Sequence, residues 1–264
     1  GWLYDDRLIL RSVKLYSDGA LGSRGAYLNA PYSDDPENRG LRFLDDTRLR
    51  NWMSKAMMNG FQVNVHAIGD GANAQVLDAF ADLIPAYGAS LRPRIEHAQI
   101  VDPADIPRFA QLGVIASVQP THATSDKAMA GDRLGEARLT GAYAWKALLG
   151  SGARIAAGSD FPVEPVNPFF GLHAAVTRQD RAGEPVGGWR FEQALSLPQA
   201  FAAFTMGAAY AGHAEGIVGS LEPGKWADFI LVDRDIFKAP PGELWQTQVR
   251  ETWLAGKRVF LRQN

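Results

Sequence analysis

The sequence of 264 residues contains no cysteine, which excludes disulfide bonds, thiolate catalysis and cysteine-ligated zinc. It also lacks an excess of positive charge, since 27 lysines and arginines are balanced by 29 aspartates and glutamates. This balance argues against a nucleic-acid partner. No run of apolar residues approaches the length of about 18 that a membrane span needs. We therefore expect no membrane association and, because no secretory signal is visible, a cytoplasmic protein.

Short apolar or β-branched segments alternate with segments of helical spacing. Helical patterns cover residues 49–57, after Asp45 and Asp46 as candidate caps, and residues 72–84. Another is predicted to start at Asp102-Pro103 and to end at Gly113, and three more cover residues 143–149, 169–176 and 198–210. Alternation of this kind predicts a parallel sheet with crossover helices. The five predicted strands are residues 12–16, 62–66, 94–97, 114–118 and 154–157.

The pattern changes in the last fifty residues. Residues 227–232, 249–254 and 257–260 have the composition of strands, and the sequence predicts loops without helices between them. A glycine-bounded stretch from Gly212 to Gly219 separates this part from the rest. We therefore predict two domains, residues 1–212 and residues 213–264.

Polar side chains with metal-binding chemistry stand at the ends of the predicted strands. His66 ends the second strand, His97 ends the third, Asp160 follows the fifth, and Lys14 lies in the first. In a β/α barrel, the carboxyl ends of the strands converge on one mouth. Neutral imidazole suits zinc, and a carboxylate binds metal or carries a proton. A lysine that has gained CO₂ becomes a carboxylate able to bridge two metal ions.

Each of these residues also has a purely structural interpretation. A single histidine at a strand end is typical of a hydrogen-bonded core residue, and Gly-Ser-Asp is a common turn. A lysine on a strand commonly extends its stem to solvent. We treat the remaining histidines, His173 and His213, as structural. On the same interpretation, Asp18-Gly19 and Gly69-Asp70-Gly71 are turns and His122 is a loop residue.

Six motifs, taken together and in order, resemble the amidohydrolase superfamily, in the branch that includes N-substituted formamide deformylases. The closing segment, residues 254–259 (LAGKRV), resembles the final strands of that family. The motifs are residues 13–24 (VKLYSDGALGSR), 65–70 (VHAIGD), 94–99 (RIEHAQ), 117–122 (SVQPTH), 157–163 (AGSDFPV) and 219–228 (GSLEPGKWAD).

The resemblance implies an α/β fold: a partial TIM-like (β/α) barrel made of strands four to eight, with a C-terminal portion of a small β-sandwich. It implies a divalent metal, zinc by default, held by His66, His97 and Asp160, with Asp160 also acting as general acid/base. Lys14 corresponds to a lysine that is carboxylated in members with two metal ions, so two ions are expected if Lys14 is modified. Residues in matching motifs that are assigned only to substrate contact or to support of the metal ligands are Arg24, Asp70 and His122.

One feature of that family is missing. The His-x-His pair of the first barrel strand has no counterpart, because all five histidines are isolated. Five strands do not close an eight-stranded barrel. Three interpretations follow: a fragment of a longer protein, which we favour, a chain that associates with a complementing N-terminal half or with copies of itself, or a degenerate member without catalysis.

The sequence therefore predicts a hydrolase of carbon–nitrogen bonds other than peptide bonds. Its substrate would be a small-molecule amide, such as an N-acyl compound, a formamide or a cyclic amide. Metal-activated water would attack the carbonyl, and Asp160 would transfer the proton. The chain alone is expected to be inactive or weakly active. The alternative is a non-catalytic binding or structural module; a phosphate-binding barrel is disfavoured because Gly187-Gly188 precedes no clear strand–helix junction.

Overall fold

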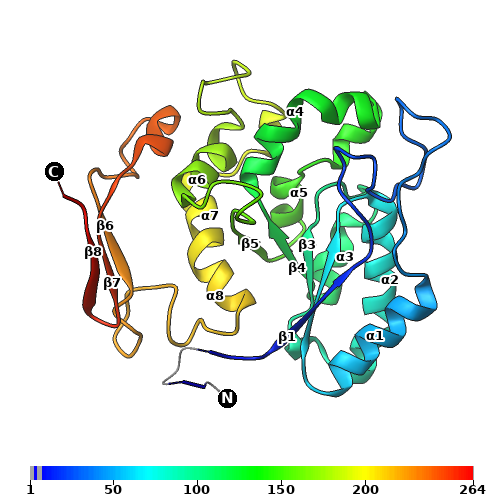
Figure 1. Ribbon diagram of the computed structural model, residues 1–264, viewed down its shortest axis with the longest axis horizontal. Coiled ribbons are helices and arrows are strands. Elements are labelled where there is room, and N and C mark those ends of the chain that lie inside the picture. The colour runs from blue at the N-terminus through cyan, green and yellow to red at the C-terminus, as the bar shows by residue number, and fades with distance from the viewer. Residues whose placement is uncertain (1–2, 5–7, 264) are drawn as a thin grey trace. The chain divides into compact units, whose positions relative to one another are not determined.

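A computed structural model describes residues 3, 4 and 8–263 of the chain (Figure 1). The fold belongs to the α/β class and contains a parallel sheet of five strands and a separate antiparallel sheet of three. The chain forms two compact units: residues 1–117 with 129–154, and residues 118–128 with 155–264. The predicted division at residue 212 stays a prediction. Among the described residues, no helix is long and apolar enough to cross a membrane.

The five predicted strands are confirmed, and they follow one another in the sheet in the order of the sequence. β1, β2, β3 and β4 pair in parallel, with Tyr16 opposite His66, His66 opposite Glu96, and Glu96 opposite Ser117. This register places side chains of the same face side by side. The strands are β1 (Ser12–Tyr16), β2 (Gln62–Ala67), β3 (Arg94–His97), β4 (Ile115–Val118) and β5 (Ile155–Ala157).

The helices of the first unit follow from apolar spacing and capping. α1 (Asp46–Met58) begins after Asp45, whose side chain accepts a hydrogen bond from the backbone N–H of Arg48 at 2.8 Å. α2 (Asp70–Tyr87) follows β2, and its Phe80 is fully buried. Both helices pack against β2. A short 3₁₀ helix, η1 (Ala89–Leu91), connects α2 to β3. The predicted helices over residues 49–57 and 72–84 are confirmed.

The structure differs from the sequence predictions at three places in this part of the chain. α3 (Ile106–Leu112) starts three residues after Pro103, the predicted first helical residue, because the Asp102 carboxylate accepts from the N–H of Ala104 at 2.9 Å and so forms a turn before the helix. α5 (Trp145–Gly150) confirms the predicted helix over residues 143–149, although it starts two residues later and includes Gly150. Residues 120–141, for which the sequence predicts no helix, form α4 (Pro120–Leu134) and the 3₁₀ helix η2 (Glu136–Gly141). His122 therefore lies in a helix, not in a loop.

The second unit contains helices after β5 and the antiparallel sheet. α6 (Pro168–Thr177) is capped by the Asn167 side chain. The predicted helix over residues 198–210 is a succession of α7 (Leu197–Ala202), the π-helical turn η4 (Ala203–Gly207) and α8 (Ala208–Ala211). Ser196 and Gln199 form a capping box at its start, which is the local reason why the helix begins there.

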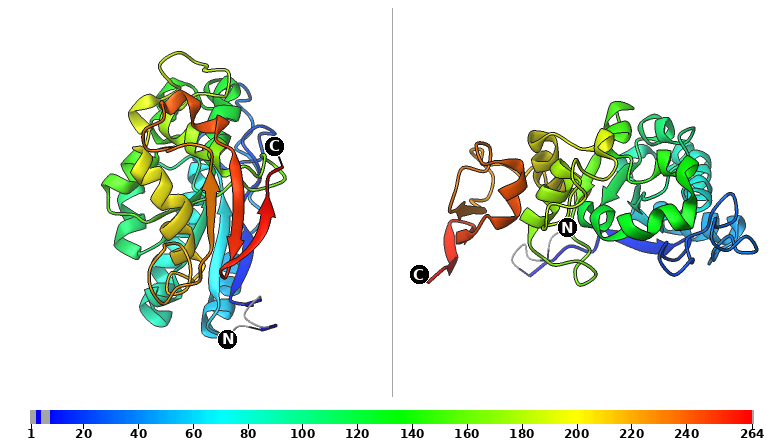
Figure 2. Two further views of the ribbon diagram at one scale, coloured as in Figure 1. Left: turned by 90° about the vertical axis from the view of Figure 1, so that its left-hand side faces the viewer. Right: turned by 90° about the horizontal axis from the view of Figure 1, so that it is seen from above.

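The three predicted C-terminal strands are confirmed as β6 (Phe229–Val232), β7 (Val249–Leu254) and β8 (Lys257–Leu261), which lie side by side in Figure 2. The rings of Phe229 and Trp253 stack across β6 and β7 with centroids 5.4 Å apart. The prediction of loops without helices is wrong, because the 3₁₀ helix η5 (Pro241–Gln246) lies between β6 and β7. Its Leu244 is fully buried, and this burial stabilises a turn that has little local signal.

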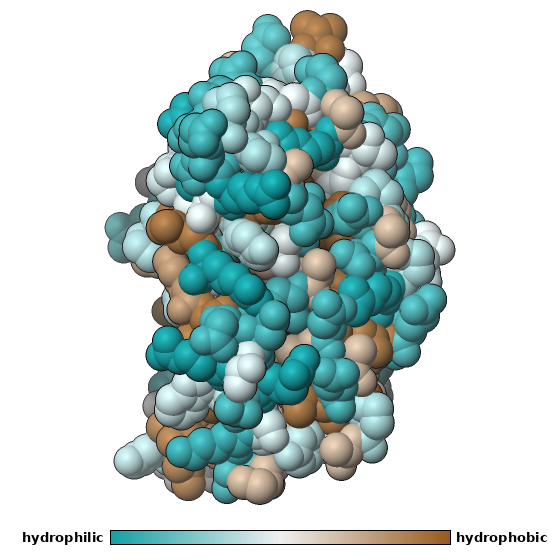
Figure 3. Space-filling view, turned by 90° about the vertical axis from the view of Figure 1, so that its right-hand side faces the viewer, coloured by the Kyte–Doolittle hydropathy of each residue, from teal (hydrophilic) through white to brown (hydrophobic). Residues whose placement is uncertain are grey.

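The two faces of the parallel sheet differ within the first unit. One face carries Val63, Val65 and Ile95, which are completely buried. The other face carries polar side chains, among them Arg94 and Glu96, which form an ion pair at 2.6 Å. Parallel sheets are commonly covered by apolar side chains on both faces, so a polar face indicates a site. The outer surface over α1 and α2 is mainly hydrophilic, with scattered apolar residues (Figure 3).

Candidate metal centre

His66 and His97 come together at the ends of the neighbouring strands β2 and β3. Their ring centroids are 4.5 Å apart, with an edge-to-face angle of 70°. The register pairs His97 with Ala67, so simple alternation along the strands would direct His97 and His66 to opposite faces. The backbone at His97 (φ 79°) and Ala98 (φ 42°) is left-handed, which ends the alternation. The strained strand end is therefore what allows the two imidazoles to meet.

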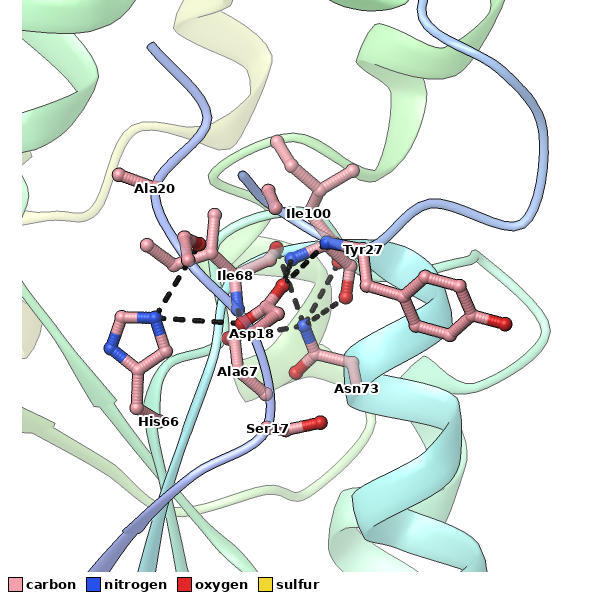
Figure 4. Close-up of polar contacts among 12 residues, drawn as sticks. Ser17, Asp18, Ala20, Tyr27, His66, Ala67, Ile68, Asn73 and Ile100 are labelled. Carbon is pink, nitrogen blue, oxygen red and sulfur yellow. Dashed lines mark hydrogen bonds and ion pairs between the residues drawn. The ribbon is translucent and has the colours of Figure 1, made fainter. Parts of the chain in front are cut away.

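A buried carboxylate lies beside His66. Asp18 is completely buried and accepts three backbone hydrogen bonds, from Ile68 at 3.0 Å, Gly69 at 2.8 Å and Tyr27 at 2.8 Å (Figure 4). The Nε2 atom of His66 lies 3.4 Å from Asp18 Oδ1 and 3.5 Å from the carbonyl oxygen of Gly19. Two acceptors at Nε2 favour the tautomer with the proton there. Nδ1 of His66 then carries the lone pair. A neutral imidazole binds a cation through its unprotonated nitrogen.

Asp18 was predicted only as part of a turn, so its place beside the histidines is a finding of the structure. Burial raises the pKa of Asp18 to about 7, although the three backbone N–H donors act in the opposite direction. The sequence did contain a signal for it, because Asp18 follows β1 closely, just as the other polar candidates stand at their strand ends. The sequence does not show which groups donate to Asp18, and these are the backbone N–H groups of residues 27, 68 and 69.

The loop after β2 is held by close backbone packing. A Cβ atom on Gly69 would lie 1.9 Å from the carbonyl oxygen of Tyr27, so no side chain fits at this position. The amide of Asn73 donates to the carbonyl oxygens of Gly69 at 2.9 Å and Ile100 at 3.1 Å. These contacts join the loops after β2 and β3. They therefore support the two strand ends from which His66 and His97 project.

Lys14 lies on β1 and is connected to the histidines through Tyr16. Its Nζ lies 4.8 Å from the ring centroid of Tyr16, and that ring lies 5.1 Å from the ring of His66. Lys14 and Tyr16 share one face of β1, with Lys14 opposite Asn64 and Tyr16 opposite His66. Lys14 is exposed. Its carboxylation and its role as a metal ligand stay predictions.

Arg24 and Asp70 make internal contacts in this structure. Arg24 donates two hydrogen bonds to Asp34, both at 3.0 Å, and the pKa of Asp34 is lowered by that contact and by Arg133. Asp70 Oδ1 accepts from the backbone N–H of Asn29 at 2.9 Å and of Gly71 at 3.0 Å. Both residues therefore stabilise the long loop between β1 and α1. Their predicted contact with substrate stays a prediction.

We expect the Asp70→Asn variant to be at least as stable as the original protein at pH 8. Burial raises the pKa of Asp70, so the folded state binds a proton more readily than the unfolded state. The carboxyl group therefore contributes most below its unfolded-state pKa, near 4, and this contribution is lost as pH rises through the higher folded-state pKa. Asparagine keeps the acceptor Oδ1 without the charge. Urea unfolding at pH 4 and pH 8 measures this, and a variant that loses stability selectively at pH 8 would contradict it.

Two predicted residues belong to the second unit. Asp160 is exposed and lies in a turn after β5, with φ 57° and its carbonyl oxygen accepting from the N–H of Val163 at 2.9 Å. Left-handed backbone at a non-glycine residue marks a constrained position. His122 is half-buried in the first turn of α4. The roles predicted for Asp160 and His122 stay predictions.

The residues present supply only part of a metal site. Within residues 3, 4 and 8–263, no group of three or more histidine, aspartate or glutamate side chains is arranged to hold a metal ion. The two adjacent imidazoles fit two ligand positions of a divalent cation, whereas a hydrolytic zinc ion has three protein ligands. The pair is thus compatible with a metal centre whose remaining ligands it does not provide.

Comparison with known proteins places this geometry in context. Residues 3–260 match the amidohydrolase family. The chain belongs to the amidohydrolase family. It is 35% identical over 249 residues to YtcJ of Bacillus subtilis, covering 94% of this chain and 47% of that protein. It is 36% identical over 261 residues to the protein LONG AFTER FAR-RED 3 of Arabidopsis thaliana, covering 98% of this chain and 43% of that protein. The family resemblance seen in the motifs is thereby confirmed.

A solved member of similar sequence is an uncharacterized metal-dependent hydrolase from Pyrococcus horikoshii. It shares 35% sequence identity and superposes with a TM-score of 0.81, over 92% of this chain and 48% of that chain. The amidohydrolase chain described here therefore spans about half the length of the relatives that it matches.

Proposed function

We propose that this chain is part of a metal-dependent hydrolase that cleaves carbon–nitrogen bonds other than peptide bonds in small-molecule amides. The observation that carries the proposal is the contact of the His66 and His97 imidazoles at adjacent strand ends, 4.5 Å apart. The match to the amidohydrolase family supports the reaction class. A 27% identical relative, the N-substituted formamide deformylase of Arthrobacter pascens, supports formamides and related N-substituted amides as the substrate class.

In this proposal the five parallel strands are part of a (β/α) barrel, and the polar face that carries His66 is its interior. His66, His97 and Asp160 would hold the metal, zinc by default, and Lys14 would join them if carboxylated. A divalent metal held there lowers the pKa of water to about 7, which supplies a nucleophile at neutral pH. Asp18 would keep His66 in the tautomer with its proton on Nε2, through the 3.4 Å contact.

Asp160 has the role of proton carrier in this proposal. Its side chain is exposed and sits at the carboxyl end of β5, the position where catalytic groups gather in β/α barrels. As a carboxylate it would accept a proton from the attacking water and donate it to the departing nitrogen, so that the amine leaves neutral. The backbone strain at φ 57° would hold the group in a fixed position.

The ligand count limits what the chain does by itself. The His-x-His pair of the family has no counterpart in this chain, and the loss of two ligands weakens metal binding, so we propose that the chain alone has little or no activity. The remaining ligands would come from residues other than His66, His97 and Asp160, in the same or in an associated polypeptide.

The test is amide hydrolysis by the full-length protein before and after metal removal. We expect a chelator to abolish hydrolysis of an N-substituted formamide and stoichiometric zinc to restore it, because the nucleophile depends on the metal. The matched control is the chelator-treated protein supplied with calcium, which prefers oxygen ligands to imidazole. Hydrolysis that persists after complete metal removal would contradict the proposal. A full-length protein that binds no metal and hydrolyses no amide would favour the non-catalytic module.

A further inference from the structure

The second unit contains a cavity of about 150 Å³ that the proposed hydrolysis does not use. It is lined by the start of α4, the segment after β5, the helix α6 and residues 179–181, and we call it the α4–α6 pocket. A neighbouring cavity of about 220 Å³ shares Thr121 and Pro165 with it and is also lined by Ser159. Ser159 directly precedes Asp160, so it is the neighbouring cavity that adjoins the segment with the proposed proton carrier, and the α4–α6 pocket shares two lining residues with that cavity.

Thr121 is the first sign that the α4–α6 pocket takes a polar ligand. The residue is 8% exposed, and within the described part of the chain its hydroxyl has no hydrogen-bond partner. A buried hydroxyl without a partner costs free energy, and native proteins rarely leave one unpaired. The hydroxyl of Thr124, one helical turn along, does have a partner, because it donates to the carbonyl oxygen of Thr121 at 2.9 Å. Thr121 is therefore available to a bound molecule.

The charges that line the pocket are the second sign. Glu164 accepts a hydrogen bond from Ser125 at 2.5 Å, and no cation pairs with it among the residues described. The guanidinium of Arg181 lies over the ring of Phe170 at 4.5 Å, and within the same part of the structure no carboxylate pairs with it. The pocket thus presents one carboxylate and one guanidinium, each without a counter-ion.

The segment that carries Arg181 is anchored. The carbonyl oxygen of Asp180 lies 3.1 Å from Nε2 of the buried His173, and the Asp180 carboxylate pairs with Lys127. Lys127 and Asp180 neutralise each other, so they add no net charge to the pocket. Anchoring of this kind keeps the Arg181 wall in place before a ligand arrives, which lowers the cost of binding.

We propose that the α4–α6 pocket binds a dipolar, amino-acid-like group that carries both an N–H donor and a carboxylate. Two N–H bonds of its ammonium nitrogen would donate, one to Glu164 and one to the hydroxyl oxygen of Thr121, and the carboxylate would accept from Arg181. This inference rests on the proposed function in one respect: the dipolar group would be a substituent of the amide substrate, separate from the bond that is cleaved. It deepens that function by naming the chemistry through which the substrate is recognised.

The test uses binding to the 264-residue chain, followed by NMR of the Thr121 and Ala174 methyl groups that line the pocket. The probes are methylamine, acetate and the zwitterions glycine, β-alanine and 4-aminobutyrate, whose charges are progressively further apart. We expect one zwitterion to bind at least about tenfold more tightly than methylamine or acetate, because it engages both charged groups. The Glu164→Gln and Arg181→Gln variants should each lose this advantage, and Thr121→Val should weaken binding by about threefold to tenfold.

Glu192→Gln, at an exposed glutamate paired with Arg190 in the same unit, is the matched control and should bind as the original chain does. Acetate binding as tightly as every zwitterion, or no methyl response to any probe at millimolar concentration, would overturn the proposal. Binding is measured here without hydrolysis. A protein that binds the zwitterion but hydrolyses the amide without metal would refute the proposed function alone. A metal-dependent hydrolase that binds none of the probes would refute only the proposed ligand of the α4–α6 pocket.

Discussion

Replacement of Asp160 by asparagine in the full-length protein is expected to lower kcat by about 10²- to 10⁴-fold, the usual contribution of a general acid/base. Asparagine has nearly the same shape and can adopt the left-handed backbone found at this position, φ 57°. It cannot accept the proton of water or donate it to the departing amine. The loss should therefore appear in kcat and in kcat/KM together, because the missing interaction belongs to the transition state.

Two controls separate chemistry from folding in that experiment. Asp132→Asn, at an exposed aspartate of α4, should keep the full rate. The Asp160→Asn protein should retain the metal that the histidines hold. The metal content is therefore measured alongside the kinetics, to separate loss of the metal from loss of proton transfer. Full activity in Asp160→Asn would contradict the role proposed for this residue.

The Asp18→Ala change is expected to destabilise the first unit by about 3 kcal/mol or more. It removes a carboxylate that accepts backbone hydrogen bonds from Tyr27, Ile68 and Gly69, and leaves these N–H groups buried without a partner. Each buried unsatisfied group costs about 1–3 kcal/mol. The total is a large share of the roughly 5–15 kcal/mol by which a domain is typically stable. Urea unfolding followed by circular dichroism measures the change.

Asp102→Ala is the matched control, because that carboxylate accepts one backbone hydrogen bond, from Ala104, and is not completely buried. We expect a cost of about 1 kcal/mol there, as for the loss of a single cap. Asp18→Asn should fall between the two, since one amide oxygen remains as an acceptor. Equal stability of the Asp18→Ala and Asp102→Ala proteins would contradict the prediction, because the three hydrogen bonds to Asp18 would then contribute no more than the single one to Asp102.

The elements predicted correctly are those with strong local signals. The five parallel strands have short apolar runs ending at polar residues, and α1 has both apolar spacing and a capping aspartate at Asp45. α4 was missed because its first half is polar (PTHATSD), so the apolar stripe is weak and the helix depends on tertiary packing. η5 was missed for a similar reason, since its formation depends on the burial of Leu244.

The candidate site was likewise predicted only where the signal is local. Strand-end position identified His66 and His97, but their contact depends on the left-handed backbone at His97 and Ala98, which the sequence does not reveal. The role of Asp18 was not predicted, because it depends on the backbone N–H groups that donate to its carboxylate. These groups lie 9 to 51 residues away along the chain. The sequence thus pointed to the two histidines as candidates, and the structure shows which residues they contact.

The central claim is that one cation binds His66 and His97 together. Zinc titration of the 264-residue chain, followed by NMR of the two imidazole rings, tests it most directly. We predict that both rings respond at the same zinc concentration, that the affinity is weak because the His-x-His pair is missing, and that His97→Asn removes the response of His66. A response of only one ring, or of the two rings at clearly different zinc concentrations, would contradict the claim.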